Sequence, residues 1–287
     1  MLSTASSEMG ETYVVTAVRY GTLATDRSDV FLNYRDYRVD DAPADMDYYF
    51  WVIRNDARTV VLDTGFAVDV GTRRGRVVCV DPREALDALD VRDERDTLLV
   101  ISHAHYDHVG NLDHLPNARM LVAAREYDFW VRHPRRLRLT DQLVEPAELA
   151  TIRSAYAAGR LALLPDGDTE IAPGILALAG YGHTPGQLML LVQTEIGGLL
   201  LTSDAVHVDE ELSARMPFRH MCDLRLSADT YDLIDEMTAS GRAARVVAGH
   251  QPGLVGRLPA HPRLPAHSAV LSSPSTTPTK EESHGTE

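Results

Sequence analysis

Short runs of apolar and β-branched residues alternate with polar breaks along most of the chain, which is the pattern of successive strands. The runs that predict strands are Tyr13–Val18, Tyr48–Arg54, Thr59–Leu62, Thr97–Ile101, Met120–Ala123, Ile175–Leu178, Leu188–Val192, Leu199–Thr202 and Arg245–Ala248. Thr97–Ile101 reads TLLVI, and such an almost wholly apolar run predicts a strand that is covered on both faces.

Other segments have the spacing of helices. The expected helices are Ala85–Val91 after Pro82, parts of residues 124–156 between breaks at Pro134 and Pro146, and a helix from the cap residue Ser227 to about Thr238. Strands and helices in two successive sets predict an α/β architecture in which helices cover sheets.

The middle of the chain contains no Pro/Gly-rich linker, so one domain is expected over residues 12–263. Residues 1–11 are a polar segment without the basic start or apolar stretch of a signal peptide. Residues 264–287 are expected to form a disordered tail rich in Pro, Ser and Thr, because residues 272–287 contain no aliphatic or aromatic side chain. No window has the roughly 18 apolar residues of a membrane span, and a cytoplasmic protein without membrane contact is expected.

The charge balance bears on the partners of the protein. The 287 residues include 42 acidic and 28 basic side chains, which gives a formal net charge of −14. Non-specific nucleic-acid binding needs a surplus of Lys and Arg, so nucleic acid is not an expected partner. The two cysteines are too few for a disulfide scaffold.

The strongest chemical signal is the segment S-H-A-H-Y-D-H-V-G-N that follows the strand Thr97–Ile101. His103, His105, Asp107 and His108 fall within six residues, at a strand end where a loop can direct several side chains to one point. Imidazole and carboxylate together suit Zn²⁺, or Fe, Mn or Co. The alternative is a solvated polar turn, but three histidines and an aspartate at this spacing favour metal ligands.

Three further candidates lie near other strand ends. His183 stands in a Gly/Pro-rich turn, Asp204 ends the apolar run that begins at Leu199, and His250 follows the strand Arg245–Ala248. Each residue alone is more often structural than functional. Because all three lie near strand ends, we expect their side chains to lie at one edge of a layered sheet, together with the histidine cluster.

The set H-x-H-x-D-H followed by His183, Asp204 and His250 resembles the metallo-β-lactamase superfamily, within it the dinuclear hydrolases that include N-acyl-homoserine lactonases and glyoxalase II. The segments L-D-T-G (Leu62–Gly65) and G-H-T-P-G-Q also match, and the resemblance spans about residues 12–256. It implies a four-layer αβ/βα sandwich that binds two divalent metal ions, with zinc as the first choice.

The resemblance also assigns roles to residues. His103, His105 and His183 would hold one metal, and Asp107, His108 and His250 the second, with Asp204 bridging them. A hydroxide between the metals would be the nucleophile. Asp63 would orient a ligand imidazole, although a simple cap at the strand end is an equal alternative for this residue.

The superfamily performs several reactions, so the fold does not decide between them. The acidic charge argues against a nuclease, no flavin domain is visible, and the chain end lacks the basic segment with which glyoxalase II grips glutathione. Opening of a small-molecule lactone, like that of an N-acyl-homoserine lactone, or cleavage of a related ester is therefore expected. A thioesterase, a polyketide cyclase and a glyoxalase II-like thioester hydrolase remain the alternatives, and a homodimer is left open.

One position departs from the lactonases that this chain resembles. They have a tyrosine three residues after the bridging aspartate, where this chain has His207. An imidazole there can donate a hydrogen bond to an oxyanion or protonate an alkoxide, so Asp107 and His207 are the candidates for proton transfer. The alternative for His207 is an ordinary polar residue at a helix start.

Two other groups of residues are candidates for contacts with the substrate. The basic run Arg132–Arg138 could meet an acidic group of the substrate, or it could be a solvated surface. Met216–Phe218 and Trp51 could line an acyl pocket, or they could belong to the core.

Overall fold

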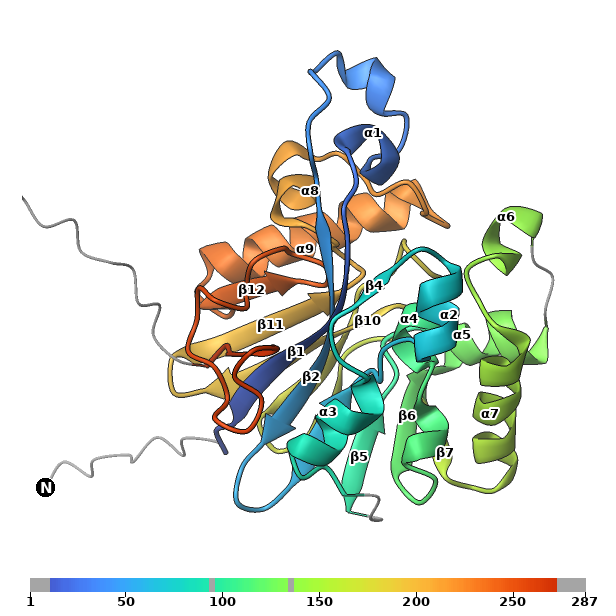
Figure 1. Cartoon of the computed structure of the whole chain (residues 1–287), viewed down its shortest axis with the longest axis vertical. Helices are drawn as coiled ribbons and strands as arrows, with labels where there is room; N and C mark the ends of the chain where they lie inside the picture. Colours follow the sequence, from blue (N-terminus) through green and yellow to red (C-terminus); the bar gives the residue numbers. More distant parts are fainter. Residues whose placement is uncertain (1–10, 93–95, 134–136, 273–287) are drawn as a thin grey trace, which may run out of the picture.

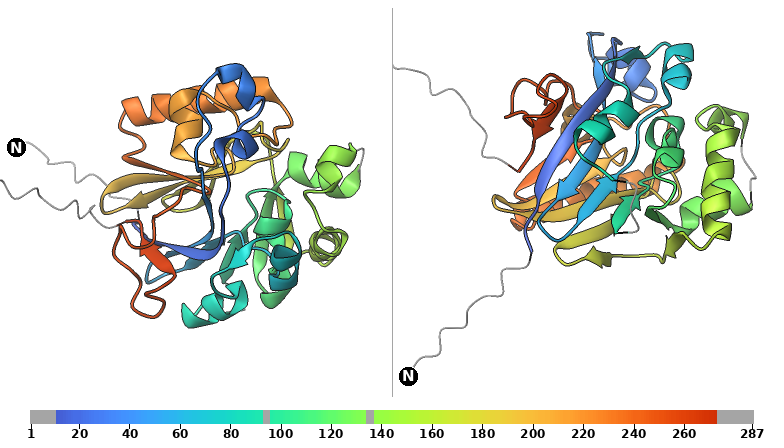
Figure 2. Two further views of the ribbon diagram at one scale, coloured as in Figure 1. Left: turned by 45° about the horizontal axis from the view of Figure 1, so that its top comes forward. Right: turned by 60° about the horizontal axis from the view of Figure 1, so that its bottom comes forward.

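The computed structural model describes residues 11–92, 96–133 and 137–272, in which two sheets lie face to face with helices on their outer sides (Figures 1 and 2). This arrangement is the expected four-layer αβ/βα sandwich. The helical elements are α1 (Arg27–Val30), η1 (Tyr34–Tyr37), α2 (Val68–Arg73), α3 (Pro82–Ala88), α4 (Tyr106–Val109), η2 (Leu112–His114), α5 (Ala124–Tyr127), the π-helical turn η3 (Asp128–Arg132), α6 (Arg138–Asp141), α7 (Pro146–Ala157), α8 (Asp209–Ala214) and α9 (Leu224–Ala239). None of the described helices is long and apolar enough to cross a membrane.

The first sheet has eight strands, seven of them in the order β13-β1-β2-β3-β5-β6-β7, with β4 paired to β1. The strands are β1 (Val14–Leu23), β2 (Met46–Arg54), β3 (Thr59–Leu62), β4 (Val77–Val78), β5 (Thr97–Val100), β6 (Arg119–Ala123), β7 (Leu161–Leu164) and β13 (Ser268–Val270). From β3 to β7 the neighbouring strands are parallel. Their carboxyl ends therefore open at one edge of the sheet.

The second sheet has the order β12-β11-β10-β9-β8. Its strands are β8 (Thr169–Ala172), β9 (Ile175–Ala179), β10 (Leu188–Thr194), β11 (Gly197–Ser203) and β12 (Arg245–Ala248). Both β9 and β11 are antiparallel to β10, and β12 is parallel to β11. The loops after β9, β11 and β12 consequently leave this sheet at the same end.

Burial of apolar side chains holds the layers together. One face of the first sheet packs on the second sheet through a cluster that includes Val15, Trp51, Leu62, Leu190 and Leu201, all of them fully buried. The other face of the first sheet packs on the helices of the first half of the chain, and the outer face of the second sheet packs on α9. Since both faces of both sheets are covered, the central strands are apolar throughout.

The strand predictions are confirmed for the long apolar runs, with changes at their ends. β1 continues to Leu23 because a bulge between Arg19 and Gly21 allows the ladder with β2 to extend. The strands β4, β7, β8 and β13 were not predicted, because they are short edge or side strands with mixed polarity. Of the expected helix breaks, Pro146 is the first residue of α7, and Pro134 lies outside the described residues.

The predicted cap of the last long helix is wrong by one turn. Asp223 is the cap of α9, and its side chain accepts hydrogen bonds from the backbone N–H groups of Arg225 and Leu226. Ser227 is buried inside the helix, and its hydroxyl donates to the carbonyl of Asp223.

The predicted end of the folded domain at residue 263 lies too early. β13 pairs antiparallel with β1, with Thr16 opposite Val270, and Leu271 is fully buried in the cluster between the sheets. The polar composition beyond residue 271 hid this short apolar segment. Residues 1–10 and 273–287, where the predicted N-terminal segment and most of the tail fall, lie outside the described residues.

Truncation of the side chain of Leu271 tests this boundary. We expect Leu271→Ala to lower the free energy of unfolding by about 2–5 kcal/mol, because a fully buried leucine leaves a cavity. The matched control Leu139→Ala truncates a leucine that is 60% exposed, and it should change the stability by no more than about 0.5 kcal/mol. Denaturant unfolding of both variants gives the comparison, and equal stabilities would mean that the C-terminal strand contributes nothing to the core.

Candidate metal centre and active-site cleft

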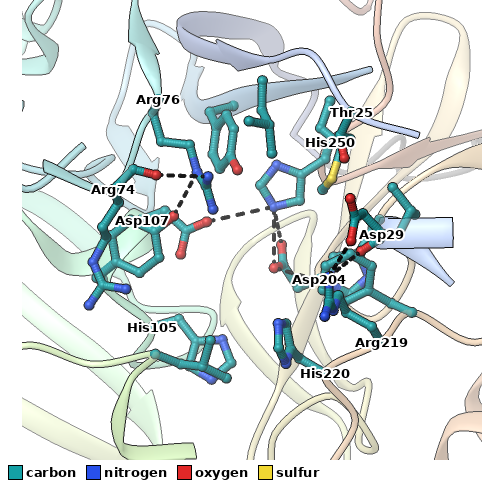
Figure 3. Close-up of a pocket in the computed structure, with 18 of the residues that line it drawn as sticks. Thr25, Asp29, Arg74, Arg76, His105, Asp107, Asp204, Arg219, His220 and His250 are labelled. Carbon is teal, nitrogen blue, oxygen red and sulfur yellow. Dashed lines mark hydrogen bonds and ion pairs between the residues drawn. The ribbon is translucent and has the colours of Figure 1, made fainter. Parts of the chain in front are cut away.

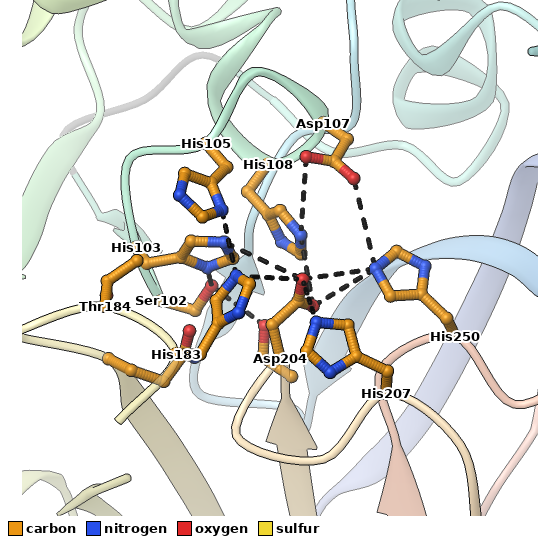
Figure 4. A network of polar contacts seen from close by, with 12 residues as sticks. Ser102, His103, His105, Asp107, His108, His183, Thr184, Asp204, His207 and His250 are labelled. Atoms are coloured by element: carbon orange, nitrogen blue, oxygen red, sulfur yellow. Dashed lines mark hydrogen bonds and ion pairs between the residues drawn. The ribbon is translucent and has the colours of Figure 1, made fainter. Parts of the chain in front are cut away.

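The carboxylate of Asp204 lies at the centre of a cluster of imidazoles where the two sheets meet (Figure 4). Its Oδ1 is 3.2 Å from Nε2 of both His108 and His250. Its Oδ2 is 3.5 Å from Nε2 of His183 and 3.8 Å from Nε2 of His103. Asp204 ends β11, so the second sheet supplies the centre of a cluster whose other members come largely from the loop after β5.

The remaining two predicted ligands complete the cluster. Nδ1 of His105 is 2.9 Å from Nε2 of His183. The two oxygens of Asp107 face His108 and His250, each at 3.9 Å from the respective Nε2. All seven residues that the sequence predicts as ligands are thus brought together, and each is buried with at most 8% of its surface exposed.

Several atoms of this cluster that could coordinate a metal have no hydrogen-bond partner within the described part of the chain. They are Nε2 of His103, His105 and His108, and Oδ1 of Asp204. An unsatisfied buried polar atom costs about 1–3 kcal/mol, so such a concentration of them needs a compensating ligand. The ligand atoms form four groups in which they lie within 4.8 Å of one another: His103/His105/His183, His103/His108/Asp204, Asp107/His108/His250 and His183/Asp204/His207. Nitrogen and carboxylate oxygen at this spacing fit a zinc-type divalent cation.

The protonation states of four of the candidate ligands favour this chemistry. Burial, together with the neighbouring imidazoles, holds the pKa values of His103 and His183 well below the ordinary value, so both rings are neutral and have a free lone pair. Burial also holds the pKa of His105 low. For Asp204, burial acts to raise the pKa, but His108 and the other imidazoles outweigh it and hold that pKa well below its usual range. Neutral imidazoles around an ionised carboxylate are the forms that bind metals.

Asp63 fixes one side of the cluster from the end of β3. Its Oδ2 lies 2.8 Å from Nδ1 of His108, and its two oxygens accept hydrogen bonds from the backbone N–H and the hydroxyl of Ser102, at 2.8 and 2.7 Å. The residue is fully buried with a φ of 65°, a left-handed conformation that is unfavourable for a non-glycine residue. The contact with His108 directs the opposite ring nitrogen, Nε2, to the cluster, which supports the orienting role over that of a simple cap.

Glu126, which the sequence analysis did not single out, joins the two histidine-bearing loops. Its Oε1 accepts from the backbone N–H of Ala104, between His103 and His105, and from the indole N–H of Trp130, at 2.9 and 2.7 Å. Its Oε2 accepts from the hydroxyl of Thr184 and the backbone N–H of Gly186, at 2.7 and 3.0 Å. A single glutamate in a helical segment carries no signal of such contacts, which exist only in the folded chain.

His207 contacts the cluster from the second sheet. Its Nε2 lies 3.3 Å from Oδ2 of Asp204, and its donor atom groups with those of His183 and Asp204. On the opposite side of the ring, Nδ1 lies 3.0 Å from Oε2 of Glu211, which also accepts from the backbone N–H of His207. Burial acts to lower the pKa of His207, but Glu211 and Asp204 outweigh it and raise this pKa to about 9. The ring is therefore held in place, with one nitrogen directed at the cluster.

The cluster forms the floor of a cleft of about 440 Å³, a size that suits a small molecule (Figure 3). Phe218 lines the cleft and stacks on His207, with 3.6 Å between ring centroids. Met216 packs in a buried cluster beside the cleft, and Trp51 belongs to the core between the sheets, so the suggestion that these two line an acyl pocket is wrong. His220 also lines the cleft.

The described members of the basic run Arg132–Arg138 do not line the cleft. Arg132 forms an ion pair with Asp128 on its own helical turn, at 2.6 Å, and residues 134–136 lie outside the described residues. The arginines that do line the cleft are Arg74, Arg76 and Arg219.

The sequence itself places the chain in a family. Residues 46–250 match the model of the metallo-beta-lactamase superfamily, and the chain belongs to that superfamily.

The matched relatives are lactonases. The N-acyl homoserine lactonase of Bacillus cereus is 32% identical over 132 residues, which are 43% of this chain and 44% of that protein. The N-acyl homoserine lactonase AiiB of Agrobacterium fabrum is 32% identical over 129 residues, 43% of this chain and 45% of that protein. The matched segment thus spans less than half the length of these relatives.

Solved structures share the fold over a larger part of the chain. A crystal structure of a quorum-quenching N-acyl homoserine lactone lactonase has a TM-score of 0.67 at 20% identity, covering 85% of this chain and 95% of that chain. AidC, a dizinc quorum-quenching lactonase in complex with a product, has a TM-score of 0.62 at 19% identity, covering 83% of this chain and 87% of that chain. These likenesses establish the common architecture.

The contacts of Glu126 predict that it sets metal affinity. We expect Glu126→Gln to weaken zinc binding by about 10–100-fold, since the amide would present N–H groups to partners that are themselves donors and would loosen both histidine loops. Competition with a chromogenic chelator measures this affinity. Glu236→Gln, on the exposed side of α9, is the matched control and should bind zinc like the wild type. Equal zinc affinities of the two variants would contradict the positioning role of Glu126.

Proposed function

We propose that the protein is a dinuclear metallohydrolase that opens a lactone ring or cleaves a related ester. The observation that carries the proposal is the buried cluster around Asp204 at the floor of a cleft. Seven side chains with nitrogen or oxygen ligand atoms meet there, and several of these atoms have no hydrogen-bond partner among the described residues. A polar cluster with a purely structural role would satisfy its own hydrogen bonds. In this cluster, potential metal-ligand atoms face one another without forming hydrogen bonds.

The proposed ligand sets follow the groups of neighbouring donor atoms. His103, His105 and His183 would hold one cation, and Asp107, His108 and His250 would hold the other. Asp204 has one oxygen near each group and would be shared. Divalent cations bound there would supply Lewis acidity, which activates water as a nucleophile and polarises the ester carbonyl.

The side chains of the protein would supply the rest of the catalysis. His207 has its Nδ1 occupied by Glu211, so its Nε2 is the atom that would hold a hydrogen bond to the developing oxyanion or pass a proton to the leaving alkoxide. Asp107 lines the cleft and would accept the proton that the attacking water loses. Phe218, Met46 and Leu143 line the same cleft and would exclude water from the acyl part of the substrate.

The choice of a lactone rests on the relatives. The matched proteins are named N-acyl homoserine lactonases, and one structural neighbour was solved with N-hexanoyl-L-homoserine bound at its catalytic metal centre. The lactonases that this chain resembles have a tyrosine where this chain has His207. An imidazole is shorter than a phenol, so we expect the substrate to differ from that of the relatives in its ring or its acyl group. The bond that is hydrolysed would still be an ester.

Removal of two ligands tests the proposal. We expect His103→Ala combined with His105→Ala to lower the bound zinc and to reduce γ-lactone hydrolysis by at least about 100-fold, the cost of losing one charge-stabilising group in an active site. A pH-indicator assay with γ-butyrolactones, N-acyl-homoserine lactones and thioesters, run beside metal analysis, measures both quantities.

The matched control for this variant is His114→Ala combined with His133→Ala, which changes two histidines outside the cluster. This control should keep wild-type metal content and turnover. Unchanged lactone hydrolysis in the first double variant would exclude the proposed mechanism. Turnover of thioesters alone by the zinc-loaded wild type would replace the lactonase by a thioesterase.

A single change tests the role of His207. We expect His207→Ala to lower kcat for lactone opening by about 10²–10⁴-fold at unchanged zinc content, because the hydrogen bond from Nε2 is made to the reacting oxygen. His220→Ala, which removes another imidazole from the wall of the cleft, is the matched control and should have a smaller effect. A wild-type kcat in His207→Ala would exclude a catalytic role.

A further inference from the structure

Arg76 is held at the mouth of the cleft by the way α2 ends. Gly75 has a φ of 76°, the left-handed conformation that glycine adopts without strain, and its N–H donates to the carbonyl of Thr72 at 3.0 Å. The N–H of Arg76 donates to the carbonyl of Gly71 at 2.9 Å. These two bonds form a Schellman motif, which fixes the backbone of the residue that follows the glycine.

The side chain of Arg76 is also fixed. Its Nε donates to the hydroxyl of Tyr106 at 3.1 Å, and one terminal nitrogen donates to the carbonyl of Arg74 at 3.1 Å. The guanidinium carbon lies 5.5 Å from the centre of the Tyr48 ring. Figure 3 shows the guanidinium group above the Asp107 carboxylate, on the wall of the cleft. The half-buried group is therefore pre-organised, and its other terminal nitrogen makes no hydrogen bond to a described residue.

The other two arginines of the cleft already have carboxylate partners. Arg74 donates to Glu145 through Nε and a terminal nitrogen, at 3.1 and 2.7 Å. Arg219 lies 3.1 Å from a carboxylate oxygen of Asp29. Among the described residues, Arg76 makes no ion pair within 4.0 Å, and the Asp107 carboxylate below it belongs to the proposed metal ligands.

Partial withdrawal of a cation from water costs free energy unless a partner of opposite charge compensates for it. Guanidinium presents a planar fork that matches a carboxylate in two parallel hydrogen bonds. Leu143 and Met46, which also line the cleft, carry no charge, and the Asp107 carboxylate belongs to the proposed metal ligands, so a carboxylate partner for Arg76 would enter the cleft from outside.

We infer that Arg76 binds a carboxylate group of the substrate, so that the substrate class is an acidic lactone or ester and not a neutral acyl compound. The inference rests on the proposed hydrolase function and adds to it the charge of the substrate. The sequence suggested that the run Arg132–Arg138 could contact an acidic group of the substrate. This inference assigns that contact to a different arginine.

Paired substrates test the inference. N-acyl-homoserine lactones with acyl chains of two lengths, each ending in a carboxylate, are compared with the same compounds ending in a carboxamide, on zinc-loaded protein. We expect the wild type to prefer each carboxylate by about tenfold or more in kcat/KM, which is the worth of one charge-assisted hydrogen bond.

Two variants test which arginine causes the preference for carboxylates. Arg76→Gln should abolish it through a higher KM for the carboxylates alone, with turnover of the carboxamides and zinc content unchanged. Arg219→Gln, which removes a paired guanidinium from the same cleft, should retain the preference. No preference in the wild type, or a preference that survives in Arg76→Gln, would overturn the inference. An equal loss for both members of a pair would also overturn it, since that result would mean that Arg76 acts on the metal centre.

A binding measurement keeps this test separate from the test of lactone hydrolysis. Calorimetry with the lactam analogues of the four compounds, whose ring amide resists hydrolysis and adds no carboxylate, reports affinity without turnover. If no lactone is hydrolysed but the carboxylates bind about tenfold more weakly to Arg76→Gln than to the wild type, the lactonase proposal fails and the role of Arg76 stands. Equal affinities in the two proteins would refute the role of Arg76, whatever the turnover.

Discussion

The structure depends on the placement of one carboxylate, Asp204, in a cluster of imidazoles, three of which, His103, His105 and His183, are kept neutral by burial. Burial raises the free energy of each ionised group, and the carboxylate remains ionised only because imidazole nitrogens face both of its oxygens. The arrangement has little stability of its own, because several of its donor atoms find no partner among the described residues. The strands that surround it must therefore supply the free energy that holds it together.

Two acidic side chains outside the cluster connect it to this framework. Asp63 holds His108 from the first sheet, in a strained backbone conformation that the core around β3 stabilises. Glu126 ties the loop after β5 to the loop that bears His183, and so connects the two sheets at their open edge. Both carboxylates accept several hydrogen bonds from fixed donors, which makes them rigid positioning groups. The metal-binding geometry is in this sense a property of the interface between the layers.

The sequence was sufficient to predict the layers and the seven side chains that come together, since these residues lie near the ends of apolar strands and strand direction alone brings them together. It was insufficient where a role depends on partners distant in the sequence. Glu126 and Glu211 look like ordinary helical acids until the fold places them beside Ala104 and His207. For Trp51 the sequence left a pocket and the core as alternatives, and the alternation of β2 turns its side chain into the core between the sheets.

β13 has a consequence for the way the protein folds during synthesis. β1 lies between β2 and β13, and the pairing of Thr16 with Val270 joins positions near the two ends of the described chain. The part of β1 from Thr16 to Val18 must therefore wait, with one edge unpaired, until nearly all of the described chain has been made. Such an edge can template association with other chains, and contacts so distant in sequence form slowly. We expect the interval between synthesis of β2 and of β13 to be the period in which the nascent chain depends most on chaperones.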